Sequence, residues 1–222
     1  MSVVVKDDFL SEENFSLLQD YCKESEFQKH VAGEKEFLAL PTPEFILPFL
    51  QKKKHQIIFT FIRKAHAEFD TDWRIHADNI INGSKVDSAS VLYIDFEENE
   101  FTGTAFWIHK EHGKQLPKDV SNEVFDKVLV EDANVPEKWN FNGVIGALKN
   151  RLLTYNANYF HSKYPNKIER GERIVLVVFY KKFSIPISAF ILTIIAVSVS
   201  AMKRRGGMGM NLAIGIAVAF TF

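Results

Sequence analysis

Almost all charged residues of this chain lie in its first 182 positions, and that uneven distribution limits the fold more than any motif does. All 28 acidic side chains precede residue 183, and residues 183–222 carry only Lys203, Arg204 and Arg205. The segment 183–202 has no charged side chain at all. A helix of that length spans about 30 Å, the thickness of a bilayer core. One chain therefore combines a charged part with an apolar part suited to a different solvent.

The apolar part has two readings. It could form a pair of helices buried in a protein core, or a hydrophobic hairpin in a membrane. The basic residues between the run at 183–202 and a second apolar run at 208–222 favour membrane insertion, because positively charged loops flank membrane helices on the cytoplasmic side. We expect residues 183–222 to form two membrane helices, the second of which is truncated.

Residues 1–182 have the composition of an ordinary folded domain. They carry 24 basic and 28 acidic side chains, hence a net charge of −4, which argues against binding nucleic acid through its phosphates. The single cysteine, Cys22, excludes an internal disulfide and a cysteine-rich zinc site and fits a reducing compartment. The opening MSVVVKDDFL lacks the pattern of a secretory signal. We therefore expect this part of the chain in the cytoplasm.

Hydrophobic periodicity predicts helices in the first third of the chain. Residues 3–9 read as a short strand, and Ser11 can cap a helix over about 12–24. A second helical stretch is expected over 44–69, interrupted near Pro48.

Beyond residue 72 the pattern changes to that of a sheet. Short runs rich in β-branched and aromatic residues alternate with turn residues: WRIHADNI, SASVLYIDF, TAFWIHK, NRLLTYNANYF and RIVLVVFYKK. Several such strands after N-terminal helices predict a mainly β fold, an antiparallel sandwich or jelly roll. The polar stretch 113–142 is expected to be an insertion that acts as a lid. The predicted domains are 1–182 and 183–222.

Two side chains in the first of these runs suit a metal site. His76 and Asp78 are two positions apart, so in a strand both point to the same face. A His and a carboxylate supply two of the three ligands of a mononuclear non-haem iron centre, and a second His completes the set. His161, where a later strand meets a turn, is the best third ligand. The alternative is that His76 is an ordinary strand-end residue and Asp78 forms a turn.

A cation stands at the start of the last strand. Arg173 comes shortly after His161 in the sequence and opens RIVLVVFY. From there its guanidinium can reach into a barrel and bind both oxygens of a ligand's carboxylate. The alternative is that Arg170 is the anchor and Arg173 lies on the surface. A jelly-roll domain that binds a ligand without catalysis would also fit these residues.

His76-x-Asp78, His161 and Arg173 together resemble the signature of Fe(II)/2-oxoglutarate-dependent dioxygenases, in particular the prolyl 4-hydroxylase-like branch. The resemblance covers residues 3–182 and departs from the family in two respects. A single glycine, Gly103, precedes the threonine strand, and the interval between the two histidines is longer than in compact members. Four further segments agree in order and spacing: VVVKDDFLSEENFSLL, SVLYIDF, FTGTAF and GERIVLVVFY.

The resemblance implies a double-stranded β-helix (jelly roll) that uses Fe(II), 2-oxoglutarate and O2, with ascorbate as a candidate reductant. His76, Asp78 and His161 would be the metal ligands and catalytic residues. Arg173 and Tyr93 would hold the C5 carboxylate of 2-oxoglutarate, although Tyr93 could instead be plain core packing. The implied reaction hydroxylates an aliphatic carbon and releases succinate and CO2. Whether the substrate is a protein side chain or a small molecule stays open, as does the oligomeric state.

The tail at 182–222 resembles a different family, the membrane permeases of lipopolysaccharide export (YjgP/YjgQ type). The likeness rests on a Lys-Phe-x-x-Pro entry, an apolar run and a basic Arg-Gly-Gly loop, and covers two of that family's six spans. The positive-inside rule would place residues 1–182 across the membrane from cytoplasmic iron and 2-oxoglutarate. We therefore expect a fusion, a frame accident or an assembly chimera. A membrane anchor and a permease fragment are the alternatives.

Two further groups of residues are expected to be ordinary surface. His109 and His112 adjoin the predicted lid, where they could touch substrate but are better read as solvated loop histidines. The run Lys52, Lys53 and Lys54 is expected to be a solvated helix face.

Overall fold

The computed structural model describes residues 3–32, 35–67, 74–96, 101–117, 120–168 and 171–182. The chain divides between Lys182 and Phe183 into two units, and the described residues all belong to the first. The membrane hairpin expected at 183–222 lies outside them. Within the ranges described, no helix is long and apolar enough to cross a membrane.

β-strand is the commonest secondary structure of the described chain. The strands are β1 (Val4–Lys6), β2 (Gln28–Ala32), β3 (Lys35–Pro41), β4 (His55–His66), β5 (Ile80–Ile81), β6 (Ser84–Lys85), β7 (Ser88–Phe96), β8 (Gly103–His109), β9 (Trp139–Gly146), β10 (Leu152–Asn156), β11 (His161–Tyr164) and β12 (Glu172–Lys182). The helical segments are α1 (Glu12–Glu24), η1 (Glu44–Ile46), α2 (Leu47–Leu50), α3 (Asn122–Asp126), η2 (Lys127–Glu131) and η3 (Pro136–Lys138).

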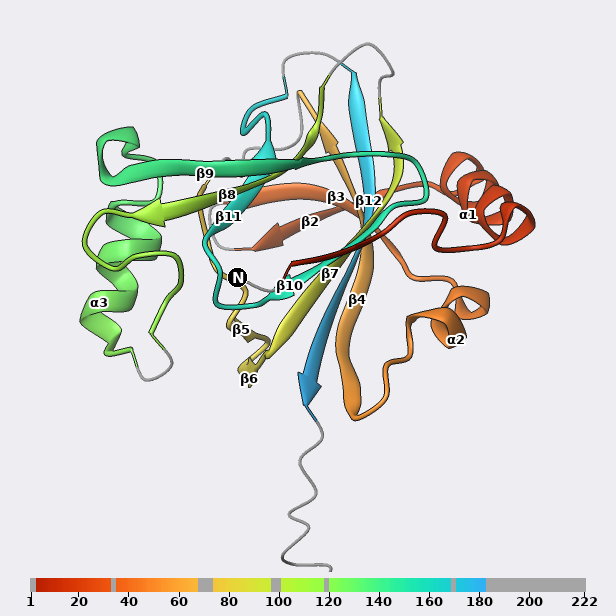
Figure 1. The fold of residues 1–222 in the computed structure, drawn as a ribbon. Helices are drawn as coiled ribbons and strands as arrows, with labels where there is room; N and C mark the ends of the chain where they lie inside the picture. The colour runs from red at the N-terminus through yellow and green to blue at the C-terminus, as the bar shows by residue number, and fades with distance from the viewer. Residues whose placement is uncertain are drawn as a thin grey trace, which may run out of the picture. The chain divides into compact units, whose positions relative to one another are not determined.

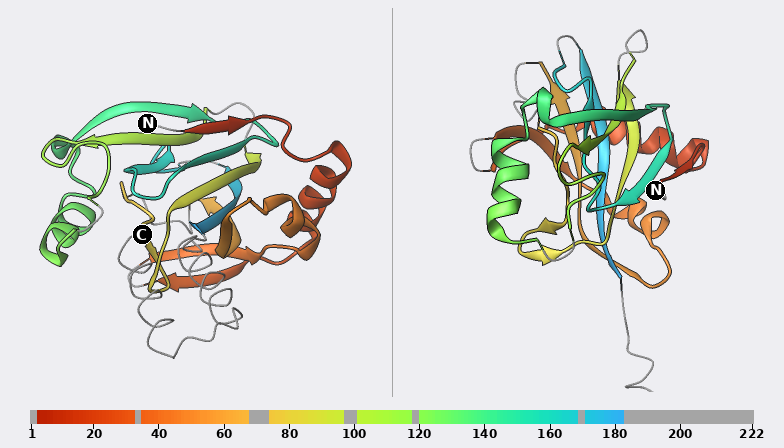
Figure 2. Two further views of the ribbon diagram at one scale, coloured as in Figure 1. Left: turned by 60° about the horizontal axis from the view of Figure 1, so that its bottom comes forward. Right: turned by 60° about the vertical axis from the view of Figure 1, so that its left-hand side comes forward.

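The strands form a large and a small antiparallel sheet, and β5 and β6 pair separately. The large sheet has the order β1-β10-β7-β12-β4-β3-β2, and the small one the order β11-β8-β9. Figures 1 and 2 show α1 and α2 on one side of the molecule and α3 on the other. The arrangement is jelly-roll-like, which confirms the predicted fold class for the described part of the chain.

Alternation along β12 explains why the large sheet is buried on both faces. Ile174, Leu176 and Val178 point into one hydrophobic cluster, which also holds Leu18 and Cys22 of α1. Val175, Val177 and Phe179 point the other way, toward Phe106 of β8 in the small sheet. Successive side chains of a strand face opposite sides, so this one strand joins the helical layer to the interior of the jelly roll.

The first helix is confirmed, with the predicted bounds and cap. The Ser11 side chain accepts a hydrogen bond from the backbone N–H of Asn14, and α1 runs over Glu12–Glu24. Such a cap satisfies one of the unpaired N–H groups at a helix start.

The helix expected over 44–69 is wrong for most of its length. Only η1 and α2 are helical, and β4 begins at His55. The β-branched and aromatic residues of β4 instead pair with β12 on one side and with β3 on the other. The run Lys52–Lys54 is not on a helix but in the connection before β4, where Lys53 and Lys54 are exposed as expected and Lys52 is half-buried. Its Nζ donates to Ser90 Oγ at 2.8 Å and lies 3.9 Å from the centre of the Tyr180 ring.

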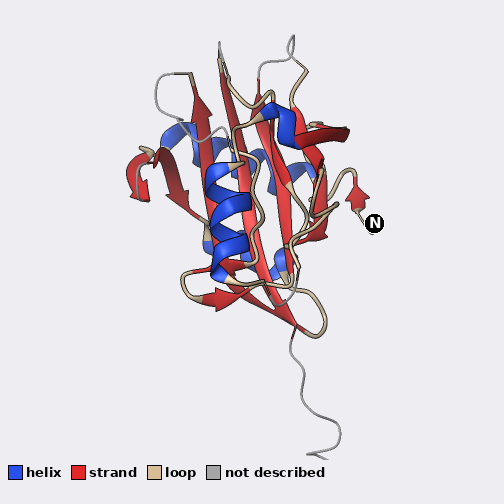
Figure 3. Ribbon diagram, turned by 90° about the vertical axis from the view of Figure 1, so that its left-hand side faces the viewer, coloured by secondary structure: helices blue, strands red, loops and turns tan. Residues whose placement is uncertain are grey.

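The stretch 113–142 contains more structure than expected of a loop. It holds α3, η2, η3 and the start of β9, and Figure 3 shows its helical part in front of the strands. Val128 and Leu129 of η2 pack with Trp139 and Phe160 in a third hydrophobic cluster. The segment is therefore anchored to the small sheet by its own core.

Candidate metal centre

His76, Asp78 and His161 come together although the two histidines lie far apart in the sequence. His76 and His161 form a backbone bridge in which each N–H donates to the other's carbonyl oxygen at 2.9 Å. The Asp78 N–H donates to the carbonyl oxygen of Ala157 at 2.7 Å. Backbone pairing thus places the three side chains side by side, and one ligand atom from each lies within 4.8 Å of the others.

The three side chains direct their polar atoms at one another. His161 Nε2 lies 3.2 Å from Asp78 Oδ2, and His76 Nε2 lies 3.7 Å from Asp78 Oδ1. Asp78 is 7% exposed and His161 4% exposed, whereas His76 is half-buried.

The hydrogen bonds of the two imidazoles fix their tautomers. His76 Nδ1 lies 3.0 Å from the carbonyl oxygen of Arg74, and His161 Nδ1 lies 2.9 Å from that of Tyr159. A carbonyl oxygen only accepts, so each Nδ1 carries the proton. Each Nε2 therefore faces Asp78 and is the nitrogen that a metal ion would bind in place of a proton, which is the arrangement of a metal-binding histidine held by a backbone carbonyl.

Asp78 is an ionised carboxylate. Its burial would raise its pKa, but the neighbouring His161 and His76 and a hydrogen bond from Tyr155 outweigh burial and hold the pKa below its ordinary value. Two imidazoles that each offer Nε2, and one carboxylate on the same side of a cavity, fit a divalent first-row metal ion with further positions open to ligands. The donor set therefore fits the ferrous ion that the sequence resemblance implies.

Tyr155 of β10 completes this polar group and was missed by the sequence analysis. Its hydroxyl lies 3.0 Å from His161 Nε2 and 3.5 Å from Asp78 Oδ2. Burial is the chief reason that its pKa is raised well above its ordinary value, so the hydroxyl stays a donor. The only signal in the sequence was its place in NRLLTYNANYF, the run that leads directly into His161.

Arg173 lines the same cavity, which measures about 110 Å³ and also includes Thr104. The guanidinium is buried, and one of its nitrogens donates to the carbonyl oxygen of Gly103 at 3.1 Å. Gly103 cannot be replaced easily, because a Cβ there would collide with the carbonyl oxygen of Ile145. Arg170, the alternative anchor, lies outside the described residues.

Tyr93 stands one layer behind the cavity wall. It is fully buried, its hydroxyl lies 2.8 Å from Thr104 Oγ1, and the Arg173 guanidinium lies 5.4 Å from the centre of its ring. Thr104, and not Tyr93, lines the cavity. The structure therefore brings four of the five predicted site residues to one cavity and places Tyr93 in contact with it through Thr104.

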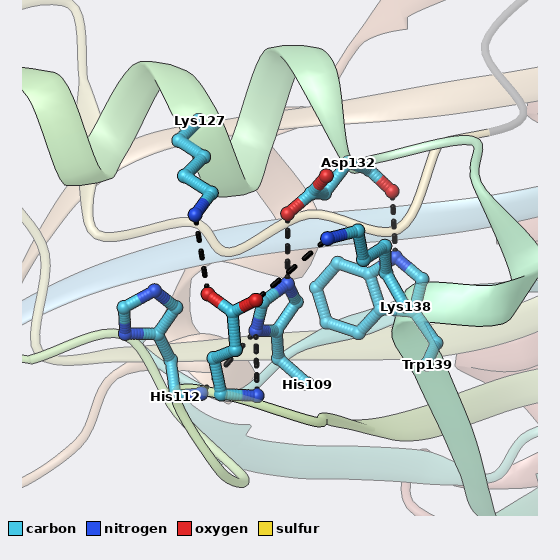
Figure 4. Close-up of polar contacts among 7 residues, drawn as sticks. His109, His112, Lys127, Asp132, Lys138 and Trp139 are labelled. Atoms are coloured by element: carbon cyan, nitrogen blue, oxygen red, sulfur yellow. Dashed lines mark hydrogen bonds and ion pairs between the residues drawn. The ribbon is translucent and has the colours of Figure 1, made fainter.

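His109 is not a solvated loop residue, so that expectation was wrong. Its side chain is 0% exposed, and its Nε2 lies 3.1 Å from Asp132 Oδ2 (Figure 4). Its Nδ1 accepts the backbone N–H groups of Glu111 and His112. Trp139 Nε1 donates to the Asp132 carbonyl oxygen at 2.7 Å. This cluster joins the end of β8 to η2 and β9.

Comparison with known proteins gives two different results. The model of the lipopolysaccharide export system permease family LptF/LptG matches residues 60–222. The match starts within β4, so it extends well beyond the tail that resembles permeases in the sequence. A search of curated proteins finds no match.

Among solved structures, similar folds occur in proteins described with 2-oxoglutarate (alpha ketoglutarate) as ligand or cosubstrate. HygX from Streptomyces hygroscopicus, with nickel, 2-oxoglutarate and hygromycin B bound, has a TM-score of 0.50 at 9% identity over 81% of this chain and 82% of that one. The carbocyclase SnoK from nogalamycin biosynthesis scores 0.52 at 11% identity, covering 85% of each chain. The epimerase SnoN, in complex with Fe3+, alpha ketoglutarate and nogalamycin RO, scores 0.50 at 11% identity over 81% and 78%. At these identities the likeness shows a shared fold.

Proposed function

The chain belongs, over residues 60–222, to the lipopolysaccharide export system permease LptF/LptG family, and we propose that its described part acts as an oxygenase dependent on Fe(II) and 2-oxoglutarate. One observation carries the proposal. His76, Asp78 and His161 bring a ligand atom each to within 4.8 Å of one another, on the wall of a cavity that also holds Arg173.

In this proposal the three side chains hold the ferrous ion from one side. The carbonyl oxygens that fix each Nδ1–H keep both Nε2 lone pairs aimed at the same point, and Asp78 supplies the negative charge. Fe(II), when bound with 2-oxoglutarate and O2, supplies the oxidising chemistry that releases succinate and CO2 and transfers one oxygen atom to a C–H bond. The finer proposal is hydroxylation of an aliphatic carbon in a protein side chain or small molecule.

Arg173 would bind the C5 carboxylate of 2-oxoglutarate. Its hydrogen bond to the Gly103 carbonyl oxygen holds the guanidinium against the cavity wall, and a planar guanidinium suits a carboxylate because it can donate to both oxygens. Thr104 lines the cavity with it, and the Tyr93 hydroxyl holds the Thr104 hydroxyl from behind. Tyr93 would thus act on the cosubstrate indirectly, as a positioning residue.

Apolar side chains from the large sheet form part of the wall. Val175, Val177 and Phe179 of β12 and Val91 of β7 line the cavity, together with the polar side chains of Arg63, Arg74, Ser162 and Lys163. The apolar part offers water no hydrogen-bonding partner, which strengthens the interaction between charged groups beside it.

Succinate release tests the reaction without knowledge of the substrate. The full chain is loaded anaerobically with Fe(II), given 2-oxoglutarate and air, and compared with His76→Ala and with the control His112→Ala, a histidine outside the cavity. We expect iron-dependent succinate that is lost only in His76→Ala. A chain that binds no iron, or whose iron binding survives His76→Ala, contradicts the proposal.

A second candidate function rests on the family match alone. The match over 60–222 favours a role in lipopolysaccharide export, in which the tail inserts in a membrane and partner ATPases drive transport. Cell fractionation would then find the intact chain in membranes, and its binding of lipopolysaccharide would be unchanged by Asp78→Ala. The oxygenase proposal places the described unit, ending at Lys182, in the cytoplasm.

A further inference from the structure

A second hollow adjoins the metal cavity on the strands at one end of the large sheet. It has a volume of about 300 Å³ and lies over β2, β3 and β4, the last three strands in the sheet order. Four aromatic side chains line it, and we call this set the aromatic groove: His30, Phe37, Phe59 and Phe61.

The rings of the aromatic groove are arranged in a connected series. The centres of Phe59 and Phe61 lie 5.3 Å apart, those of Phe61 and Phe37 6.0 Å, and those of Phe37 and His30 5.8 Å. The Arg63 guanidinium lies 5.2 Å from the centre of the Phe37 ring. These separations are typical of aromatic pairs that attract one another, so the series is an ordered surface.

The aromatic groove shares a lining residue with the cavity of the candidate metal centre. Phe61 lines both hollows. Arg63, two positions further along β4, also lines the metal cavity. A ligand lying on Phe59 and Phe61 would therefore have one end directed at the cavity that contains His76, Asp78 and His161.

The exposure of the rings indicates that a bound ligand covers them. Phe59 is 41% exposed although it belongs to a long strand in the interior of the sheet order. A volume of 300 Å³ falls at the lower end of the range for small-molecule sites, about 300–1,000 Å³. An exposed apolar hollow of this kind, next to convergent polar groups, is typical of a binding site.

The chemistry of the lining selects a class of ligand. Ring faces dominate it, and the side chains of Ala39, Leu40 and Pro41 add hydrocarbon. A peptide laid on this surface would bring an amide group with every residue, and each buried amide needs a hydrogen-bond partner. A planar ring system needs none and gains from stacking against Phe59, Phe61 and Phe37.

We propose that the aromatic groove binds the planar aromatic part of a small-molecule substrate whose reacting carbon extends past Phe61 into the metal cavity. The position of the reacting carbon rests on the proposed oxygenase function. The affinity of the groove for planar rings does not, which allows the two to be tested separately.

Binding of 2-naphthol to the full chain tests the groove itself. Phe59→Ser is compared with Phe45→Ser, a matched control because Phe45 of η1 is 40% exposed and outside the groove. Loss of one aromatic contact is expected to weaken binding about fivefold or more in Phe59→Ser, with no change in Phe45→Ser. Equal affinities in the two variants, or no binding by the unaltered chain, overturn the proposal. So does a dimer, seen by light scattering, in which naphthol and the second copy compete.

Proximity to the metal centre is tested with Mn(II), whose unpaired electrons broaden the proton signals of a nearby ligand. We expect 2-naphthol signals to broaden with Mn(II) and the unaltered chain, and to sharpen again in Phe59→Ser and in His76→Ala. Naphthol that binds in the groove without broadening, while Mn(II) is bound, overturns the link to the metal cavity. A chain that binds no Mn(II) contradicts the oxygenase function instead, and the comparison of Phe59→Ser with Phe45→Ser still decides the groove.

Discussion

The molecule contains two histidine–aspartate pairs that look alike by distance and differ in what they can do. His161 Nε2 lies 3.2 Å from an oxygen of Asp78, and His109 Nε2 lies 3.1 Å from an oxygen of Asp132. All four side chains are buried. Both histidines lie at the ends of paired strands of the small sheet, His161 starting β11 and His109 ending β8.

The difference lies at the other ring nitrogen. His161 Nδ1 donates to a carbonyl oxygen, which leaves Nε2 as the nitrogen that a metal ion can bind. His109 Nδ1 instead accepts the backbone N–H groups of Glu111 and His112, so its Nε2 must carry the proton that it donates to Asp132. A metal ion can bind the first pair, whereas the second pair is already satisfied. The backbone group facing Nδ1 therefore separates a candidate ligand from a structural residue.

Removing the two carboxylates one at a time should give the largest difference between the two pairs. Asp78→Ala should weaken Fe(II) or Co(II) binding more than about 100-fold, because loss of a ligand costs more than loss of the groups that orient it. Asp132→Ala should leave metal affinity unchanged. Calorimetric titration with Co(II) measures both. Equal loss in the two variants would show that the tautomers do not distinguish the pairs.

His109→Ala should have the opposite effect, lowering stability while leaving metal affinity unchanged. It leaves a cavity and deprives Asp132 and two backbone N–H groups of their partner, so we expect the free energy of unfolding to fall by about 2–4 kcal/mol. Urea denaturation measures the change, with His112→Ala as the neighbouring control, for which little change is expected. Metal affinity per folded molecule should stay the same. A His109→Ala variant as stable as the unaltered chain would contradict the structural role.

Tyr155→Phe tests whether a neighbouring hydroxyl orients the pair formed by His161 and Asp78. The Tyr155 hydroxyl lies beside both His161 Nε2 and Asp78 Oδ2, and a bound metal would occupy the Nε2 lone pair and leave Asp78 as its partner. Loss of such an orienting hydrogen bond should lower metal affinity by up to about tenfold. The absorption spectrum of bound Co(II) should shift as well. An unchanged affinity and spectrum would assign the hydroxyl to packing alone.

Acid should lower the stability contributed by the two pairs in different pH ranges. This effect should be smaller than those of the three substitutions above. The pKa of His109 is lowered from 6.5, chiefly by burial. The unfolded chain then binds a proton more readily, so the stability contributed by neutral His109 is present above pH 6.5 and is lost as the pH falls below it. The lowered pKa of Asp78 acts only below its ordinary value of 3.8. Thermal unfolding between pH 7 and 5 should be less pH-dependent in His109→Gln, and an unchanged slope would exclude His109 as its source.

Local patterns in the sequence predicted those parts of the fold that depend on local chemistry. Ser11 and the acids after it mark the start of α1, and alternation marks β12. The helix expected where β4 lies arose from the ambiguity of its pattern. Ile57, Phe61 and Ala65 recur with helical spacing while they also alternate as in a strand. Pairing with β12 decides between the two, and partners that distant in the sequence are not visible in a local window.

The candidate site likewise has residues that the sequence could identify and residues that it could not. Spacing and position in the expected strands identified His76, Asp78, His161 and Arg173, and the resemblance added Tyr93. It did not identify Tyr155, because nothing local shows that its hydroxyl points at His161. The burial of His109 depends on Asp132 and Trp139, which reach it from another segment. Contacts of that kind are made only when the chain is folded.

The backbone bridge between His76 and His161 bears on whether the chain would fold before or after it binds a metal ion. Each residue holds the other through its own amide and carbonyl, and Asp78 is held by Ala157, so the three ligands are positioned before any ion arrives. Under the proposed function the chain would therefore fold first and acquire its metal last. An ion that binds only this finished arrangement would protect it from unfolding by an amount that grows with the logarithm of the free ion concentration, and the thermal stability of the protein would then respond to the iron available in the cell.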